Sequence, residues 1–242
     1  MELREHPPLS REDVHVWTAN LDQAKSVAQS FLSILAPDEL IRAKKYSFAE
    51  HRERFVIARG VLRKLLGRYA GVGPEQLRFC YGPQGKPVLA QRGSDQLCFS
   101  VSHSHRLAIY AVTLNRQIGV DVEYLREDLA SMEMAERFFA TRESETIAAL
   151  PAELRTVGFF NCWTRKEAYI KAQGSGLSLP LDQFEVSLAP GEPATILWLE
   201  DELEQSRNWT LKELALFQGY IGAVAVGGAG WQLTCWDWTD FK

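Results

Sequence analysis

The spacing of hydrophobic and polar residues along the chain predicts a mixture of helices and strands. Apolar residues that recur every three or four positions predict long amphipathic helices at 49–71 and 157–173. Shorter helices are expected at 22–35, 37–48 and 129–150. Runs rich in β-branched and aromatic residues predict strands at 13–19, 117–125, 219–228 and 231–238, and two strands within each of the segments 77–90 and 97–115.

The two long helices stand in similar surroundings, which indicates a loose internal duplication. Each is followed by a loop that contains glycine or proline and then by strands. Helix 49–71 with its hairpin would correspond to helix 157–173 with its strands, and the join would lie near 115–117. We therefore expect an α/β (α+β) protein built from two similar halves, residues 1–115 and 116–242.

Three charged side chains interrupt the apolar face of helix 157–173. Glu167 falls among aromatic positions, Lys166 lies beside it, and Lys171 follows one turn later. Charged side chains are almost never fully buried unless they are paired or bind a metal. An ion pair between Glu167 and Lys171, four positions apart, would account for two of them. It leaves Lys166 unexplained, unless the long side chain of this lysine extends to solvent.

Two carboxylates share one face of the strand 117–125. Asp121 and Glu123 are two positions apart, so their side chains point to the same side. Like charges this close repel unless a cation lies between them, and Mg²⁺ prefers such oxygen ligands. A solvated strand end is the alternative interpretation. If Glu167 joined the pair, three carboxylates would surround one Mg²⁺, with the two lysines of the helix facing bound phosphates.

Basic residues in the first half could recognise phosphate. Arg52, Arg59 and Arg63 form a stripe beside the apolar face of helix 49–71, and Lys86 lies in a Gly-Lys-Pro loop. Phosphate recognition in proteins commonly uses arginine and lysine. The alternative is a solvated face of mixed charge, which is common on protein surfaces.

A cluster of serines and histidines marks the turn within the segment 97–115. Ser102, His103, Ser104 and His105 follow one another there. Serine with histidine suggests nucleophilic catalysis, but no Gly-x-Ser-x-Gly motif accompanies the cluster. Two histidines suggest a transition metal, but no third ligand is suitably spaced. The remaining interpretations are hydrogen bonding to a ligand phosphate and a simple polar turn.

Composition narrows the class of protein. The 242 residues are 46% hydrophobic, enough for a core, and the net charge of −4 argues against a general nucleic-acid-binding surface. No apolar run is long enough to span a membrane, and the charged N-terminus is unlike a signal peptide. The four cysteines form no Cys-x-x-Cys pair and are expected to be reduced core residues. A cytoplasmic protein is expected.

Four motifs together resemble those of the Sfp-type 4′-phosphopantetheinyl transferases. "IGVDVE" (118–123) followed by "WTRKEAYIK" (163–171) is similar to the signature of this family. "GPQGKPVL" (82–89) and "FSVSHS" (99–104) resemble its two upstream motifs, in the same order. One such motif alone would be a weak signal, whereas four in order make the resemblance specific.

The resemblance implies two similar halves in pseudo-twofold relation, with the active site at their interface. It implies coenzyme A as donor, Mg²⁺ as metal, and a serine of an apo acyl, peptidyl or polyketide carrier protein as acceptor, with release of 3′,5′-ADP. The protein would act as a monomer, without nucleic acid or membrane. The site residues implied are Asp121, Glu123 and Glu167 for the metal, Glu167 and Lys171 for catalysis, and Arg52, Arg59, Lys86, Ser102, His103 and Lys171 for coenzyme A, with Arg42 as a further candidate.

Other functions remain compatible with these residues. A Mg²⁺-dependent phosphohydrolase would use the same acids with water as nucleophile. A non-catalytic module would bind a carrier protein without modifying it, and a hydrolase would use Ser102 and His103. Fatty-acid, polyketide and nonribosomal-peptide carrier proteins all stay open as acceptors.

Overall fold

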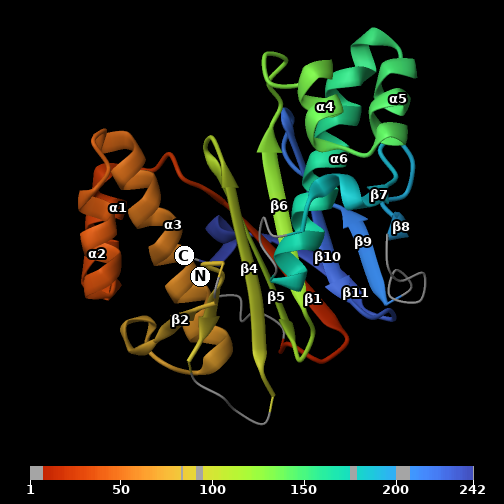
Figure 1. Ribbon diagram of the computed structural model, residues 1–242. Coiled ribbons are helices and arrows are strands. Elements are labelled where there is room, and N and C mark those ends of the chain that lie inside the picture. Colours follow the sequence, from red (N-terminus) through yellow and green to blue (C-terminus); the bar gives the residue numbers. More distant parts are fainter. Residues whose placement is uncertain (1–7, 83, 91–94, 175–178, 200–207, 242) are drawn as a thin grey trace.

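The same succession of helices and strands occurs twice along the chain (Figure 1). The computed structural model describes residues 8–82, 84–90, 95–174, 179–199 and 208–241. The first half contains β1 (Asp13–Asn20), α1 (Lys25–Phe31), η1 (Leu32–Ile34), α2 (Pro37–Lys44), α3 (Ala49–Ala70), η2 (Pro74–Gln76), β2 (Phe79–Tyr81), β3 (Pro87–Leu89), β4 (Leu97–Ser104) and β5 (Leu107–Leu114). Apart from η1, the second half repeats this order with β6 (Ile118–Tyr124), α4 (Met132–Phe138), α5 (Thr141–Ala149), α6 (Ala152–Gln173), η4 (Leu181–Gln183), β7 (Phe184–Val186), β8 (Ile196–Leu199), β9 (Trp209–Glu213) and β10 (Tyr220–Gly227). The chain then continues into β11 (Gln232–Asp237) and η5 (Trp238–Phe241).

The strands form two main sheets whose orders match. One sheet has the order β11-β1-β5-β4 and the other β6-β10-β9, so β1, β5 and β4 correspond to β6, β10 and β9. All neighbours in these sheets are antiparallel except β1 and β11. The expected duplication is therefore confirmed. Because β11 joins the sheet of the first half, the chain crosses back after β10, and the division into residues 1–115 and 116–242 stays a prediction.

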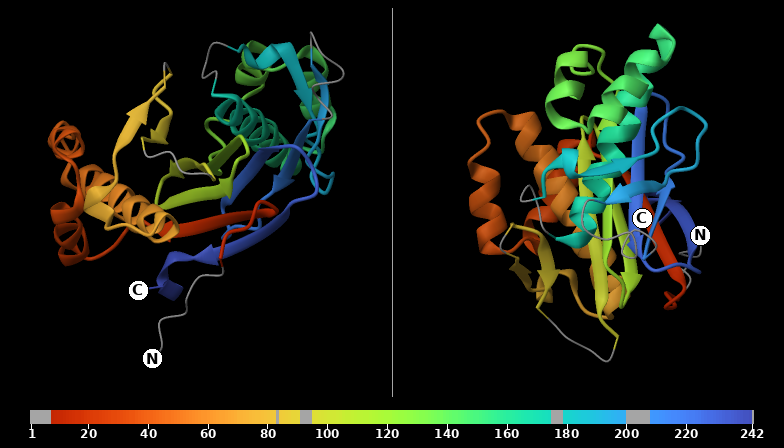
Figure 2. Two further views of the ribbon diagram at one scale, coloured as in Figure 1. Left: turned by 90° about the horizontal axis from the view of Figure 1, so that it is seen from below. Right: turned by 45° about the vertical axis from the view of Figure 1, so that its right-hand side comes forward.

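The long helix of each half covers the outer face of its sheet. In the first half, Leu62 of α3 belongs to one buried cluster with Tyr110 of β5. In the second, Ala168 of α6 is buried together with Ala225 of β10. The inner faces of the two sheets pack on each other through small and branched apolar side chains. Figure 2 shows α3 and α6 on either side of β4, so the two halves meet between their long helices.

Helix α6 lies unusually close to β6, and a glycine makes this possible. A Cβ atom at Gly119 would lie 2.0 Å from the carbonyl oxygen of Ala168 and 2.3 Å from the backbone nitrogen of Ala172. Neither backbone atom can move without shifting the helix, so only glycine fits here. The close approach brings the C-terminal half of α6 next to the part of β6 that carries Asp121.

Most predicted elements are confirmed, and the differences have identifiable physical causes. The helix expected at 129–150 is two helices, because the chain is extended at Phe139 and Ala140 and the Glu143 side chain accepts a hydrogen bond from the Ala140 N–H. The short strands β7, β8 and β9 were not predicted, since their pairing depends on tertiary contacts. None of the described helices is both long and apolar enough to cross a bilayer.

The four cysteines are free, but they are not all core residues. Cys162 is buried, Cys98 is partly buried, and Cys80 and Cys235 are exposed. The expectation of a core position is therefore wrong for Cys80 and Cys235. Both lie on strands at a sheet edge, where every second side chain points to solvent.

Candidate active site

Asp121 is the central side chain of the predicted metal site. It lies on β6 and is almost fully buried. Its Oδ1 atom accepts hydrogen bonds from the Ser102 hydroxyl at 2.8 Å and from the Lys171 ammonium at 2.6 Å. Its Oδ2 atom is also buried but has no hydrogen-bond partner among the described residues. Buried polar atoms nearly always have a partner, so an unpaired oxygen such as this one is a candidate for binding a ligand.

Glu123 and Glu167 carry the other two predicted metal-binding carboxylates. Burial raises the pKa of both above the usual range. The carboxylate of Asp121 raises each pKa further, and Glu123 adds to the effect on Glu167. The structure therefore brings the three acids close enough to repel one another, although one comes from a helix and two from a strand.

Lys171 joins the acids to β4 of the first half. Its ammonium pairs with Asp121 and donates a hydrogen bond to the Ser102 hydroxyl at 3.0 Å. Among the described residues its ion pair is with Asp121 and not with Glu167, so the simple intrahelical pair is not the arrangement found. The reason is the close packing of α6 on β6, which points Lys171 at the strand.

Lys166 has a purely structural environment. Its side chain is 0% exposed, against 31% for Lys171, and its ammonium pairs with the buried carboxylate of Glu143 at 2.7 Å. It also donates to the backbone carbonyls of Leu181 and Phe184. The expectation that Lys166 faces bound phosphates is therefore wrong. Its partner Glu143, on α5, was not identified from the sequence because nothing in the local pattern distinguishes it from a solvated helix residue.

The three acids offer the donor set of a hard metal ion without yet enclosing one. All their donor atoms are carboxylate oxygens, and Oδ2 of Asp121 is unsatisfied. Within the part of the chain that the structure describes, no three His, Cys, Asp or Glu side chains stand in a metal-binding arrangement. The acids therefore fit a Mg²⁺ ion in chemistry, and their side chains would have to converge on it.

Lys86 lies beside the end of α6. Its ammonium donates to the carbonyl oxygens of Ile118 at 2.9 Å and Lys171 at 2.5 Å. Burial lowers the pKa of Lys86 to about 8. Lys86 and Lys171 line one cavity of about 330 Å³, together with Glu167. In this structure Lys86 ties the β2–β3 loop to the helix end, and contact with a phosphate stays a prediction.

A second cavity, of about 300 Å³, lies beside α3. His103 and Arg54 line it, together with Leu21, Tyr46, His51, Phe55, Ala58 and His105. Desolvation lowers the pKa of His103, and the nearby charges of Lys171 and Arg42 lower it further. Several cationic groups therefore converge around His103. Arg54 was not selected from the sequence, because its spacing did not distinguish it from other arginines of α3.

Two of the three arginines in the stripe on α3 form ion pairs within the protein. Arg59 and Arg63 both pair with the buried carboxylate of Glu39 on α2. Arg63 also donates to the carbonyl oxygens of Pro74 and Leu77. Arg59 and Arg63 therefore hold α2 against α3. Arg52 lies exposed near the start of α3, and the assignment of Arg52 and Arg59 to a ligand phosphate stays a prediction.

The serine–histidine cluster is not arranged as a hydrolase triad. The Ser102 hydroxyl donates to Asp121 and accepts from Lys171. The neighbouring His103 lies on the opposite face of β4, as successive strand residues do. Ser102 therefore has no histidine base among its hydrogen-bond partners in the described structure.

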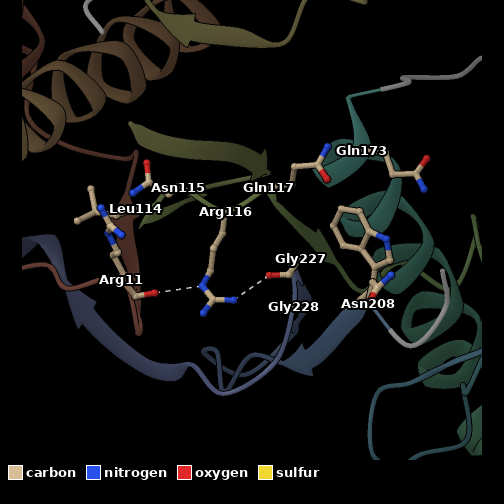
Figure 3. A pocket seen from close by; sticks show the side chains of 10 residues that line it. Arg11, Leu114, Asn115, Arg116, Gln117, Gln173, Asn208, Gly227 and Gly228 are labelled. Carbon is tan, nitrogen blue, oxygen red and sulfur yellow. Dashed lines mark hydrogen bonds between the residues drawn. The ribbon is translucent and has the colours of Figure 1, made fainter. Parts of the chain in front are cut away.

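A further cavity lies away from the acids. It has a volume of about 920 Å³, and its charged lining residues are Arg11 and Arg116 (Figure 3). Arg116 is held by hydrogen bonds to the carbonyl oxygens of Arg11 and Gly227, both at 3.1 Å. None of the described residues that line this cavity carries a carboxylate or an imidazole, the groups most often used for proton transfer.

The chain is similar in sequence to 4′-phosphopantetheinyl transferases over most of its length. The pattern of the 4′-phosphopantetheinyl transferase superfamily matches residues 117–225, and that of the N-terminal region of 4′-phosphopantetheinyl transferase matches residues 17–115. The chain is 43% identical over 231 residues to the 4′-phosphopantetheinyl transferase HetI of Nostoc sp., covering 95% of this chain and 94% of that protein. It is 31% identical over 160 residues to the 4′-phosphopantetheinyl transferase Sfp of Bacillus subtilis, covering 66% of this chain and 69% of that protein.

These similarities agree with the arrangement of the site. The superfamily pattern spans the strand with Asp121 and Glu123 and the helix with Glu167 and Lys171. The N-terminal pattern spans β4, which carries Ser102. The chain therefore belongs to the Sfp-type 4′-phosphopantetheinyl transferase family.

Proposed function

We propose that the site between the two halves transfers the 4′-phosphopantetheine arm of coenzyme A to a serine hydroxyl of an apo carrier protein and releases 3′,5′-ADP. The family to which the chain belongs supports this reaction. The observation that carries the assignment to this site is the carboxylate of Asp121. It is buried, is bound on one oxygen by Lys171 and Ser102, and is free on the other.

Asp121, Glu123 and Glu167 would hold the Mg²⁺ ion of this reaction. Burial raises the pKa values of Glu123 and Glu167, and the carboxylate of Asp121 raises them further; a bound cation would relieve this repulsion. When bound, the ion would neutralise negative charge on the phosphate oxygens of coenzyme A. Mn²⁺ has similar ligand preferences, so it can serve as a spectroscopic substitute.

Glu167 is the proposed proton acceptor. The oxygen of the carrier serine attacks the β-phosphorus of coenzyme A, and its proton passes to the Glu167 carboxylate, directly or through one water. Glu167 lines the same cavity as Lys171, which places its carboxylate beside the proposed reaction centre. The new O–P bond forms as the bond between the β-phosphorus and the leaving phosphate oxygen breaks, so the acceptor serine receives the phosphopantetheine arm.

Lys171 is the proposed stabiliser of the leaving group. The oxygen that departs with 3′,5′-ADP gains negative charge as its bond breaks, and an ammonium that donates to it lowers the barrier. Lys171 is partly exposed and lines the same cavity as Glu167, which supports this role. Ser102 keeps the ammonium directed at the site from the other half of the molecule.

Cationic groups in the two cavities are the proposed binding groups for the coenzyme A phosphates. Lys86 lines the cavity beside α6, and His103 lines the cavity beside α3. Arg42 and Arg54 extend the positive charge towards α2 and α3. We favour Arg42 for the 3′-phosphate, because Arg59 is already paired with Glu39, and Arg54 with Asp22 and Glu50.

Intact-mass measurement of candidate acceptors tests this function. The protein is incubated with coenzyme A, Mg²⁺ and a panel of apo carrier proteins from fatty-acid, polyketide and nonribosomal-peptide systems. At least one carrier protein should gain the mass of a single phosphopantetheine arm, and chelation of the metal should prevent the gain. The carrier proteins that react, and their relative rates, define the specificity.

The same experiment separates the alternatives. Release of 3′,5′-ADP without any carrier protein would indicate a phosphohydrolase. Tight binding of a carrier protein that never gains mass would indicate a non-catalytic module. A carrier protein in which the acceptor serine is replaced by alanine is the matched control, since it keeps the docking surface and removes the nucleophile.

A further inference from the structure

Three serines of β4 occupy alternate positions and all contact β6. Ser100, Ser102 and Ser104 share one face of the strand because successive strand residues alternate. β4 and β6 are the last strands of their respective sheets. The three hydroxyls therefore connect the two halves at an edge where the two main sheets are not joined into one.

Ser104 contacts Glu123, one of the three proposed metal-binding carboxylates. Its hydroxyl donates to Oε2 of Glu123 at 2.7 Å. Its oxygen accepts a hydrogen bond from the backbone N–H of Tyr124 at 3.1 Å. Because a hydroxyl has one proton and the Tyr124 N–H occupies an acceptor site on its oxygen, the O–H is directed at Glu123.

Ser100 makes a different contact. Its hydroxyl oxygen accepts from the backbone N–H of Val120 at 3.1 Å, and no carboxylate is involved. Ser100 is buried and lies two positions before Ser102 on the same face. It therefore stabilises the junction of β4 and β6 in the same way as Ser104 but without contacting an acid.

We propose that Ser104 is a positioning residue that holds the Glu123 carboxylate for the metal ion. The inference rests on the proposed function, in which Glu123 is a metal ligand. The hydrogen bond engages Oε2 of the Glu123 carboxylate and restricts the rotation of this side chain. Hydrogen bonds of this kind orient metal ligands in proteins, and their loss weakens metal binding.

Direct binding of Mn²⁺ tests the proposal without relying on turnover. Free Mn²⁺ is followed by its electron paramagnetic resonance signal as the full-length protein is titrated with the metal alone. Ser104→Ala should weaken Mn²⁺ affinity by about tenfold or more. Ser100→Ala is the matched control and should bind Mn²⁺ as the parent does. Ser104→Thr keeps the hydroxyl and should restore most of the affinity.

A double substitution shows whether Ser104 acts through Glu123. In the Glu123→Gln background, Ser104→Ala should cause little further loss of Mn²⁺ affinity, because the positioned carboxylate is already absent. If Ser104→Ala weakened Mn²⁺ affinity by the same factor in the parent and in the Glu123→Gln background, the proposal would be contradicted. Should Ser104→Ala lower the melting temperature so far that binding is not measurable, Ser104→Cys keeps the volume and replaces the hydroxyl by a weak donor.

The outcomes separate this inference from the proposed function. Parent-like Mn²⁺ affinity in Ser104→Ala, with normal loss of affinity in Asp121→Asn, would overturn the role of Ser104 and leave the metal site intact. A parent protein that binds no Mn²⁺ and modifies carrier proteins in the presence of chelator would overturn the metal site, and the role of Ser104 with it.

Discussion

Glu167 has an electrostatic environment that opposes its own charge. Burial raises its pKa, and the carboxylates of Asp121 and Glu123 act in the same direction. A group whose pKa is higher in the folded than in the unfolded protein stabilises the fold at low pH. That contribution is lost as the pH rises through the folded-state pKa. At neutral pH, without metal, ionised Glu167 therefore destabilises the protein.

We expect Glu167→Gln to stabilise the metal-free protein at neutral pH. The amide has the same shape and no charge, so the repulsion with Asp121 disappears. Each 1 kcal/mol corresponds to about 2–4 °C in melting temperature for a chain of this size. Thermal melts in chelator, from acidic to slightly alkaline pH, measure the effect. The difference between variant and parent should be small below the ordinary glutamate value of 4.5 and grow as the pH rises. A parent-like melting temperature at every pH would contradict the repulsion.

Lys166 and Lys171 are five positions apart on α6 but have opposite roles, which a pair of substitutions can separate. Lys166→Met leaves Glu143 buried without its counterion and should cost about 3–5 kcal/mol of unfolding free energy. Lys171→Met should cost much less, because the side chain of Lys171 is 31% exposed and Ser102 still donates to Asp121. The transfer rate of Lys171→Met should fall about a hundredfold, or about 2.7 kcal/mol.

Denaturant unfolding and single-turnover transfer on the same preparations distinguish these two lysines. A Lys171→Met variant that transfers at the parent rate would show that Lys171 does not take part in the reaction. A Lys166→Met variant as stable as the parent would show that the Glu143 pair contributes little to the fold.

The packing of helices on the sheets depends on buried charges as well as on apolar contacts. Glu39 connects α2 to α3. One of its carboxylate oxygens accepts a hydrogen bond from Arg59, and the other accepts one from Arg63. Glu39 also accepts the backbone N–H of Ala36 at 2.9 Å, which caps the start of α2. One side chain therefore fixes the beginning of α2 and its contact with α3.

Glu39→Gln should destabilise the protein strongly. It leaves Arg59 and Arg63 without a negative partner, and breaking a buried ion pair from one side costs about 3–5 kcal/mol. Arg52→Ala is the control on the same helix, and as an exposed residue it should change stability by about 0.5 kcal/mol or less. Equilibrium urea unfolding measures both. Equal stabilities of the two variants would contradict the structural role assigned to the arginine stripe.

At the scale of the whole molecule, strong periodicity made the long elements predictable from the sequence. Helices α3 and α6 and the strands β4, β5 and β6 follow from regular apolar patterns. The short strands β7 to β9 carry no such pattern and exist because of the partners they pair with. The extended residues between α4 and α5 depend on Glu143, whose side chain also contacts Val186 far along the chain.

The candidate site was predictable where the residues form a motif and not where their partners are distant. Asp121, Glu123, Glu167 and Lys171 belong to the family signature, and the structure brings Lys171 to Asp121. The ion-pair partners of Lys166 and Arg59 could not be read from local spacing, because they lie on other helices. The contribution of Ser104 likewise depends on the junction of two sheets.

Single-turnover transfer by Asp121→Asn tests the central claim most directly. The asparagine keeps the shape of the side chain but removes the charge that would hold a metal ion beside Glu123 and Glu167. We predict that the parent protein modifies an apo carrier protein with coenzyme A and saturating Mg²⁺, while Asp121→Asn, folded as judged by circular dichroism, loses at least about a thousandfold in rate, roughly 4 kcal/mol. Transfer by Asp121→Asn within tenfold of the parent would contradict the assignment of the reaction to this site.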